Sequence, residues 1–301
     1  MTRHLLTTTD VTSSEQRRIL DLAQLAAKDL GAPLGGKGVA LIFEKPSNRT
    51  RHSMEMAVVQ LGGHPVYTRG EEIGFDVREP VEDIAAVMSG YHAILAARVF
   101  DHVTVERLAR ASSVPVVNML SDAQHPLQAL ADVLTMTEEF GSLDGRTVAY
   151  VGDFNNVARS LVQASAMCGA HVRIGCPNGY GPTPDELNEL RDLGAASVAA
   201  GESMEEAVEG ADAVHTDTWT SMGQEAESAR REKDFAGWTV SSATMAHAKP
   251  SAIFMHCLPA HRGMEVAIDV IDGPTSRIIR QAHNRMHAAR GALAFLMEVN
   301  S

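Results

Sequence analysis

The feature that most constrains the fold is a repeated alternation of short apolar runs with segments of helical periodicity. In the first half, four apolar runs are expected to form buried strands, at 38–43, 64–68, 93–98 and 115–120. Helical spacing lies between them, near 49–62, 80–91 and 102–112. The second half repeats this pattern, with apolar runs at 147–152, 171–176, 212–217 and 252–258. Strands that alternate with helices form parallel sheets with helices on both faces.

Two such series predict an α/β protein with two doubly wound parallel-sheet domains joined by inter-domain helices. The apolar spacing within 125–146 predicts a helix at the join, and the last 20 residues predict another. The expected domains are 1–136, with a C-terminal helix at 281–301 packing back on it, and 137–280. A chain of 301 residues that is 45% hydrophobic can supply a core to each.

Composition excludes several classes of protein. A formal net charge of −12 argues against general binding to nucleic acid or to anionic membranes. No apolar stretch approaches the ~18 residues that span a bilayer, and the N-terminus lacks a signal-peptide core. The three cysteines include no C-x-x-C pair, which fits a reducing cytoplasm. An anionic ligand must therefore be held by a local basic cluster.

The stretch "FEKPSNRTR", 43–51, is such a cluster at a predicted strand-to-helix turn. Ser47 or Asn48 can cap the helix that follows, whose free amides and dipole favour an anion. Arg49 and Arg51 can add charge-assisted hydrogen bonds, and a phosphate is the anion that these groups fit. The alternative is a well-capped helix with solvated arginines. The P-loop pattern is absent.

Three more stretches follow strand ends, and each alone also fits an ordinary structural role. In "HPLQ", 125–128, His125 and Gln128 could hydrogen-bond a carbonyl oxygen. In "DTWTSMGQE", 217–225, Asp217 could pair with an ammonium group and Ser221 could meet a carboxylate.

The third stretch is "HCLPAHRG", 256–263. His256 and His261 raise the question of a metal, but Pro259 breaks helical spacing between them, so no metal site is predicted. The turn "VGDFNN", 151–156, lacks the G-x-G-x-x-G fingerprint, which makes a dinucleotide cofactor unexpected.

Together these stretches resemble the carbamoyltransferase family. S-x-R-T-R, H-P-x-Q, D-x-x-x-S-M-G and H-C-L-P occur in the family's order, with "GDxNN" and "NRxHA" also present. The first two motifs are shared with aspartate carbamoyltransferases, whereas S-M-G and H-C-L-P are specific to the ornithine branch. The resemblance runs nearly end to end.

The resemblance implies a set of site residues. Phosphate binding is implied for Ser47, Asn48, Arg49 and Thr50, with Arg98 bridging the phosphate and the carbonyl and His125 and Gln128 holding the carbamoyl group. The amino-acid head of ornithine is implied to be held by Asn156, Asp217, Ser221 and Met222. Cys257, Leu258 and Arg285 are implied to complete the carbamoyl phosphate site between the domains, with Arg98, His125 and Cys257 as the catalytic residues.

The implied reaction is carbamoyl transfer from carbamoyl phosphate to the δ-amine of L-ornithine, without metal, cofactor or covalent nucleophile. The family works as a homotrimer whose sites are completed by the neighbouring subunit. Two alternatives stay open: a carbamoyltransferase for another amine, such as putrescine or an N-acylated ornithine, and a catalytically silent regulatory homologue. The intact D-T-W-T-S-M-G and the matched polar residues argue against them.

The loop at 69–83 departs from the family pattern. Many ornithine enzymes carry there a Gln that reaches the neighbouring subunit's phosphate, whereas this chain has Glu72. A carboxylate near a phosphate dianion is repulsive, by roughly 1 kcal/mol in water at 4 Å. We therefore expect Glu72 to turn toward Arg69 or Arg78, leaving one of those arginines for the phosphate. Asn48 and Phe154 are smaller departures, at positions where the family commonly has Thr and Gly.

Overall fold

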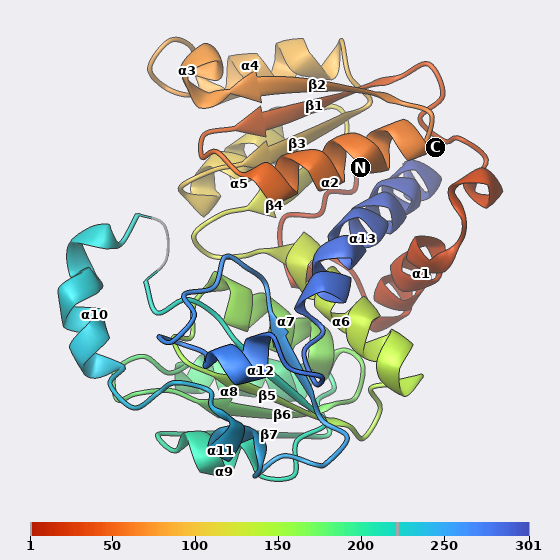
Figure 1. The fold of residues 1–301 in the computed structure, drawn as a ribbon. Helices are drawn as coiled ribbons and strands as arrows, with labels where there is room; N and C mark the ends of the chain where they lie inside the picture. The colour runs from red at the N-terminus through yellow and green to blue at the C-terminus, as the bar shows by residue number, and fades with distance from the viewer. Residues whose placement is uncertain (1, 221–222, 301) are drawn as a thin grey trace. The chain divides into compact units, whose positions relative to one another are not determined.

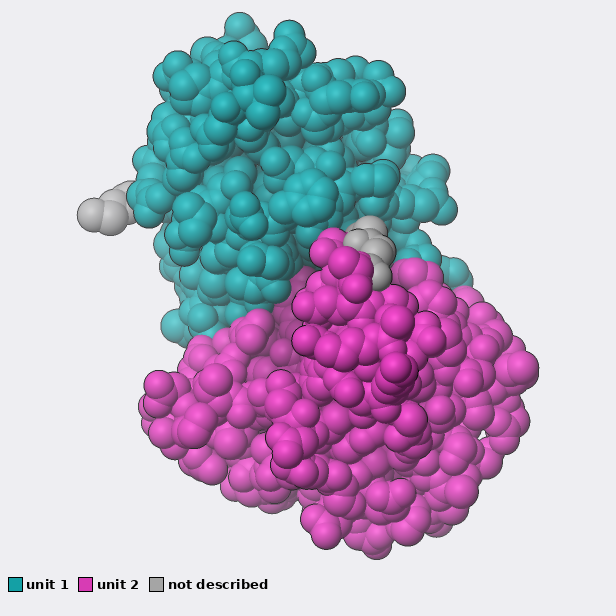
Figure 2. Space-filling view, turned by 90° about the vertical axis from the view of Figure 1, so that its left-hand side faces the viewer, with its two compact units in different colours: residues 1–131, 283–301 teal, residues 132–282 magenta. Residues whose placement is uncertain are grey.

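The computed structural model describes residues 2–220 and 223–300, which form two compact units (Figures 1 and 2). Unit 1 contains residues 1–131 and 283–301, and unit 2 contains residues 132–282. Unit 1 is therefore discontinuous in sequence, because the whole of unit 2 is inserted between its two parts.

Unit 1 is built on a four-stranded parallel sheet in the order β2-β1-β3-β4. Its strands are β1 (Gly38–Phe43), β2 (His64–Arg69), β3 (Ile94–Arg98) and β4 (Val116–Leu120). Its helices are α1 (Ser13–Gln24), α2 (Asn48–Gln60), α3 (Gly70–Ile73), α4 (Val81–Ser89) and α5 (His102–Ala111), with 3-10 turns at Thr8–Asp10 and Ala27–Leu30.

Helices cover both faces of this sheet. One apolar layer joins alternate residues of β1 and β3, such as Ala40, Ile42 and Leu95, to α4 and α5. On the other face lie α2 and the C-terminal helix (Figure 1). The register of β3 against β4 shifts between Ala97 and Arg98, the last residue of β3.

Unit 2 is built on a five-stranded parallel sheet in the order β7-β6-β5-β8-β9. Its strands are β5 (Thr147–Val151), β6 (His171–Gly175), β7 (Ser197–Gly201), β8 (Ala213–Thr216) and β9 (Ile253–His256). Its helices are α7 (Asn156–Ala166), α8 (Pro184–Asp192), α9 (Met204–Val208), α10 (Ser228–Asp234), α11 (Ser242–Met245) and α12 (Ile268–Ile271), with a 3-10 turn at Glu225–Glu227. A buried layer that includes Val151, Val214 and Phe254 packs under α9 and α12.

Two helices cross the boundary between the units. Helix α6 (Pro126–Phe140) crosses it after Ala131, and α13 (Ile278–Val299) crosses it after Ala282. Within unit 1, Gly291 lets α1 approach α13 closely, because a Cβ there would collide with the Ile19 carbonyl oxygen and with Ala23.

The predicted α/β architecture with two parallel sheets is confirmed. The eight predicted strands are present, but β7 was not predicted. Its sequence, "SVAAG", consists of small residues that are mostly exposed at the sheet edge, so it lacks an apolar signature. The helix predicted within 125–146 ends at Phe140. Among the described residues, no helix has the length and apolar character needed to cross a membrane.

Candidate active site

The turn after β1 forms a capped helix start. Ser47 is the N-cap of α2, and its Oγ accepts the Thr50 N–H at 3.4 Å, while Asn48 is exposed. Arg49, partly buried in the first turn, forms no ion pair with another described residue. Arg51 does not join it, because it pairs with Glu55 at 2.8 Å.

Thr50 is the point where other predicted residues of unit 1 meet. Its Oγ1 accepts from Arg285 Nη2 at 3.1 Å and from Arg98 Nη1 at 3.4 Å. Arg285 Nη1 also donates to Gln128 Oε1 at 2.6 Å. These four side chains come from α2, β3, α6 and α13, and all are buried. The structure therefore brings together residues that lie far apart in sequence.

His125 lies beside this group and is buried immediately before α6. The loop that delivers it is held by Ser121, whose N–H donates to the Gln124 carbonyl at 3.0 Å. Burial lowers the pKa of His125 well below its ordinary value, and the guanidinium groups of Arg285 and Arg98 lower it further. The imidazole is therefore neutral at neutral pH and can serve as a hydrogen-bonding group for a carbonyl oxygen.

Lys45 is a buried cation that sequence reasoning did not assign to the site. Burial lowers its pKa, and the charge of Arg98 adds to that effect. Its ammonium lies 4.4 Å from the ring centroid of Phe100. The signal was available, since Lys45 lies in the same nine-residue stretch as Ser47 and Arg49. The unit 1 cluster, defined as Lys45, Arg49, Thr50, Arg98, His125, Gln128 and Arg285, is cationic and suited to a phosphorylated carbonyl compound.

In unit 2, Asp217 is the centre of a second group. Cys257 Sγ donates to Asp217 Oδ1 at 3.1 Å, and Asn155 Nδ2 donates to Asp217 Oδ2 at 2.9 Å. Asn155 is also the N-cap of α7, where its Oδ1 accepts from the amides of Val157 and Ala158. Sequence reasoning named its neighbour Asn156, which is the first residue of α7. The N-cap position in "GDFNN" was the available signal for Asn155.

The strand β9 ends at His256, so Cys257 and Leu258 belong to the loop that follows. The alternation of side chains along a strand therefore does not separate the two residues, and a ring nitrogen of His256 and the Cys257 thiol both lie near the Asp217 carboxylate. Leu258 has a φ of 59°, a left-handed conformation that non-glycine residues adopt mainly where the surrounding structure imposes it.

Asp217, His256 and Cys257 offer atoms that lie within 4.8 Å of one another, the kind of group that can hold a metal ion. Both ring nitrogens of His256 are already used, however. Nδ1 accepts the Leu258 N–H at 2.9 Å, and Nε2 lies 3.2 Å from Glu265 Oε1. A metal ion would have to displace one of these buried hydrogen bonds, so the donor set does not fit a resident metal.

Two predicted ornithine ligands, Ser221 and Met222, lie outside the described residues. The segments on either side of them are described. Asp217 and Trp219 are buried, and Gly223 is exposed.

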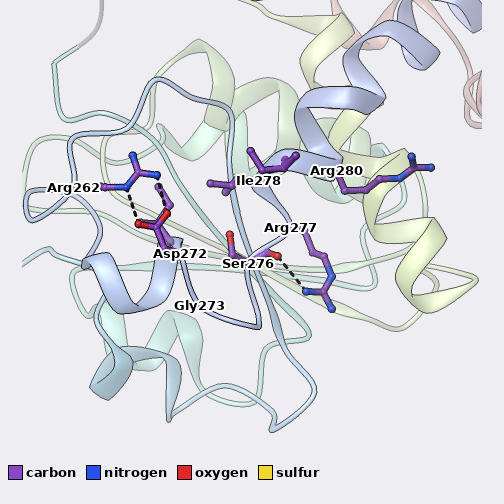
Figure 3. Close-up of a pocket in the computed structure, with 9 residues that line it drawn as sticks. Arg262, Asp272, Gly273, Ser276, Arg277, Ile278 and Arg280 are labelled. Atoms are coloured by element: carbon purple, nitrogen blue, oxygen red, sulfur yellow. Dashed lines mark hydrogen bonds and ion pairs between the residues drawn. The ribbon is translucent and has the colours of Figure 1, made fainter.

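A separate hollow of about 350 Å³ lies in unit 2 at the start of α13 (Figure 3). None of the predicted site residues lines it. Its arginines are already paired: Arg262 with Asp272 at 2.8 Å, Arg277 with Glu139 at 2.7 Å, and Arg280 with Glu138. We therefore do not assign it to the site.

The loop at 69–83 is folded, with α3 at its start and with Ile73 and Phe75 buried. Glu72 turns toward Arg69, accepting from its Nη2 at 3.2 Å and from its backbone N–H at 2.9 Å. Arg69 also pairs with Glu71, whereas Arg78 donates to the Glu72 backbone carbonyl at 2.8 Å. The prediction that Glu72 faces Arg69 or Arg78 is confirmed.

Comparisons with known proteins cover almost the whole chain. Residues 3–138 match the model of the carbamoyl-P binding domain of aspartate/ornithine carbamoyltransferase, and residues 144–296 match that of its Asp/Orn binding domain. The ornithine carbamoyltransferase of Acidothermus cellulolyticus is 48% identical over 99% of this chain and 97% of its own length. That of Thermus thermophilus is 47% identical over 94% of this chain and 93% of its own length.

A solved structure from the same family has the same fold. The ornithine carbamoyltransferase from Pyrococcus furiosus superimposes with a TM-score of 0.93 and 44% sequence identity, covering 98% of this chain and 97% of that one. Two family models that together span most of the chain, relatives at nearly half identity over more than nine-tenths of their length, and a matching fold lead to one conclusion. The chain belongs to the aspartate/ornithine carbamoyltransferase family.

Proposed function

We propose that this protein transfers the carbamoyl group of carbamoyl phosphate to the δ-amine of L-ornithine, giving L-citrulline and phosphate. The observation that carries the proposal is the hydrogen bond from Cys257 to Asp217 at 3.1 Å. It joins the two stretches, D-T-W-T-S-M-G and H-C-L-P, that are specific to the ornithine branch. The relatives named above, which carry that activity in their names, support it.

Unit 1 binds carbamoyl phosphate in this proposal. Ser47, Asn48, Arg49 and the first-turn amides of α2 hold the phosphate, with Thr50, Arg98 and Arg285 completing its contacts. His125 and Gln128 hold the carbamoyl group. Negative charge develops on the carbonyl oxygen as the amine attacks, and a neutral His125 beside Arg98 stabilises it without proton transfer.

Unit 2 binds the amino-acid head of ornithine. The carboxylate of Asp217, held in place by Cys257 and Asn155, pairs with the α-ammonium, and Asn156, Ser221 and Met222 contribute the remaining contacts. In this proposal, Leu258 and Cys257 contact the carbamoyl group. Much of the rate comes from holding two substrates in a reactive geometry.

The chemistry balances without a cofactor or covalent intermediate. The lone pair of the neutral δ-amine forms a bond to the carbamoyl carbon, and the carbon–oxygen bond to phosphate then breaks, with its electron pair leaving on phosphate. The attacking nitrogen releases one proton to the phosphate or to solvent. Since an alkyl ammonium has a pKa of about 10.4, activity should rise with pH through the neutral and alkaline range.

A comparison of amines tests the proposal. Carbamoylation by carbamoyl phosphate should be measured with ornithine, putrescine, aspartate and N-acetylornithine at matched concentrations. Ornithine is expected to be preferred, because only a free α-amino acid head satisfies Asp217. A preference for putrescine or N-acetylornithine would assign another amine, and no product with any of the four would point to a regulatory homologue.

The assembly proposed is a homotrimer in the cytoplasm in which each site is completed by the neighbouring subunit. Exposed apolar side chains on α2 and β2, namely Met56, Val59 and Val66, support a contact surface on unit 1. None of the three cysteines, all of which are described, forms a disulfide, and this supports a reducing compartment. Analytical ultracentrifugation tests the trimer, and cell fractionation tests the location.

A further inference from the structure

The residue Arg231 lies outside the proposed contacts with either substrate, yet it is one of the few buried cations of unit 2. It lies on α10, its side chain is 8% exposed, and its Nη1 lies 2.8 Å from Asp153 Oδ2, which is also buried. Burial opposes the charged form of Arg231, but Asp153 and Glu227 outweigh this effect and raise its pKa. The side chain is therefore a permanent cation held inside the unit.

The same Nη1 atom also donates to the backbone carbonyl of Trp219 at 2.9 Å. Trp219 lies two residues beyond Asp217, and Asp153 lies two residues before Asn155. Since Asn155 hydrogen-bonds Asp217 directly, one guanidinium joins the two segments that carry this pair. These segments follow neighbouring strands, β5 and β8, at the end of the sheet where ligands bind in open α/β folds.

The helix that carries Arg231 is itself held in place by an aromatic cluster, defined as Trp219, Phe235 and Tyr180. The Trp219 ring stacks on Phe235 with centroids 5.7 Å apart, and Tyr180 meets Phe235 edge-on at 4.7 Å. The backbone carbonyl of Tyr180 also accepts the N–H of Phe154, and Phe154 lies in the same turn as Asp153. The position of the guanidinium is therefore fixed by its own hydrogen bonds and by the aromatic packing of the helix that carries it.

We propose that Arg231 is a positioning residue for the amino-acid substrate: it holds the Asp217 segment against the Asp153–Asn155 turn and so sets the geometry with which Asp217 meets the α-ammonium. This inference rests on the proposed function and deepens it, since it concerns the ornithine half of the reaction alone. The partners of Arg231 among the described residues all belong to unit 2, so the binding of carbamoyl phosphate should not depend on it.

Arg231→Gln is the direct test, with Arg230→Gln as the matched control. Arg230 is adjacent in sequence and carries the same charge, but its side chain is 62% exposed and pairs with Glu227 and Asp234. Because a displacement near 1 Å can cost about 100-fold in rate, we expect Arg231→Gln to raise the KM for ornithine at least about tenfold, with the KM for carbamoyl phosphate within about twofold. Arg230→Gln should change neither.

Binding without chemistry gives a second measurement. L-Norvaline keeps the α-amino-acid head and the three-carbon side chain but lacks the δ-amine, so its inhibition constant against ornithine reports recognition of the head. It should rise in parallel with the ornithine KM in Arg231→Gln. Arg231→Lys, which keeps the charge but cannot reach Asp153, Trp219 and Glu227 together, should recover part of the loss.

If Arg231→Gln does not fold, Asp153→Asn tests the same inference. It removes the negative charge that pairs with Arg231 while keeping the shape of the side chain. It should raise the ornithine KM in the same selective way. A merely structural role would lower the active fraction, and hence the apparent kcat, while leaving both KM values unchanged. That result, or an equal change in both KM values, would overturn the inference. Wild-type protein that forms no citrulline would instead overturn the proposed function.

Discussion

The turns after β1 in unit 1 and after β5 in unit 2 are built alike but lie beside side chains of opposite charge. Each runs from a buried parallel strand into a helix whose N-cap, Ser47 or Asn155, accepts first-turn amides. In unit 1 the surrounding side chains are cations, whereas in unit 2 the cap's own amide group donates to the carboxylate of Asp217. The backbone motif is therefore shared, and the side chains that converge on it decide the local charge.

The largest effect should come from removing Arg98, one of the buried cations of unit 1. Arg98→Gln is expected to lower kcat about 1,000-fold, because one preorganised donor to a developing oxyanion contributes about 100- to 1,000-fold and the lost charge adds to it. Steady-state citrulline formation with both substrates varied measures this. Arg18→Gln, which removes an exposed arginine paired with Glu298, is the control. A loss below tenfold would contradict the role of Arg98.

The corresponding change in unit 2 is Asp217→Asn. Loss of one partner of a desolvated charge pair costs at least about 2 kcal/mol, or about 30-fold, so the KM for ornithine should rise by that factor or more. The KM for carbamoyl phosphate should stay nearly constant. Asp234→Asn, which alters an exposed carboxylate that accepts from Tyr180, is the control. Equal loss for both substrates would refute the assignment.

A third prediction concerns the loss of folding stability in acid that is caused by one buried histidine in each unit, His215 in unit 2 and His125 in unit 1. Burial lowers the pKa of His215 to about 3, so its folded pKa lies below its unfolded value of about 6.5. As pH falls below about 6.5 the unfolded chain gains a proton that the folded chain refuses, and stability is lost by up to about 1.4 kcal/mol per pH unit. The same direction holds for His125.

Urea unfolding of wild type and His215→Asn between pH 7 and pH 4 checks this. The variant is expected to show a shallower dependence of unfolding free energy on pH, by close to one proton. The slope is the readout, because the absolute stability also changes when Gln281 loses its partner at 3.1 Å. An unchanged slope would mean that His215 takes up a proton in the folded state.

Cys257→Ser should have a smaller effect, because a serine hydroxyl can replace the thiol as the donor to Asp217. We expect turnover to persist, with the ornithine KM raised by about fivefold, the size of one modest hydrogen bond. Initial-rate kinetics should show both substrates bound before product release. A carbamoyl-cysteine found by mass spectrometry, or ping-pong kinetics, would make Cys257 a nucleophile instead.

The smallest effect is expected at the 69–83 loop. Arg69 is paired with Glu71 and Glu72, so Arg78 is the better candidate for a phosphate contact across subunits. Arg78→Ala should raise the KM for carbamoyl phosphate about threefold, as an exposed charge pair does, and Arg69→Ala should leave it nearly unchanged. If neither changes it beyond about twofold, or if Glu72→Gln lowers it strongly, the loop makes no such contact.

The elements that sequence reasoning located are those whose packing leaves a periodic apolar pattern. β1 was predicted closely because both of its faces are buried, which leaves a continuous apolar run, and α2 and α13 were predicted closely because their apolar residues recur at helical spacing. β7 was missed because a mostly exposed edge strand with one valine among serine, alanine and glycine carries no such pattern. The domains were expected to divide at 136/137 and 280/281, whereas the compact units divide at 131/132 and 282/283, inside continuous helices.

The site divides in a similar way. Motif residues such as Thr50 and Asp217 were found because they stand next to chemistry-bearing neighbours in the sequence. Lys45 and Asn155 were not assigned although each had a local signal, in the basic stretch 43–51 and at the N-cap position of "GDFNN". Arg231 was not assigned because its importance depends on Asp153, a partner brought near by folding. A charged residue on a short helix gives no sign in sequence that it is buried.

Because unit 2 is inserted within unit 1, the ribosome completes unit 2 before it completes unit 1. Every residue of unit 2 is synthesised before residues 283–301, which include Arg285 and the part of α13 that packs on unit 1. Domains generally fold as units during synthesis, so unit 2 can reach its final structure before the last helix of unit 1 has been synthesised. A chain released too early therefore carries a finished ornithine half but lacks the arginine that joins Thr50 to Gln128, and it can form no citrulline.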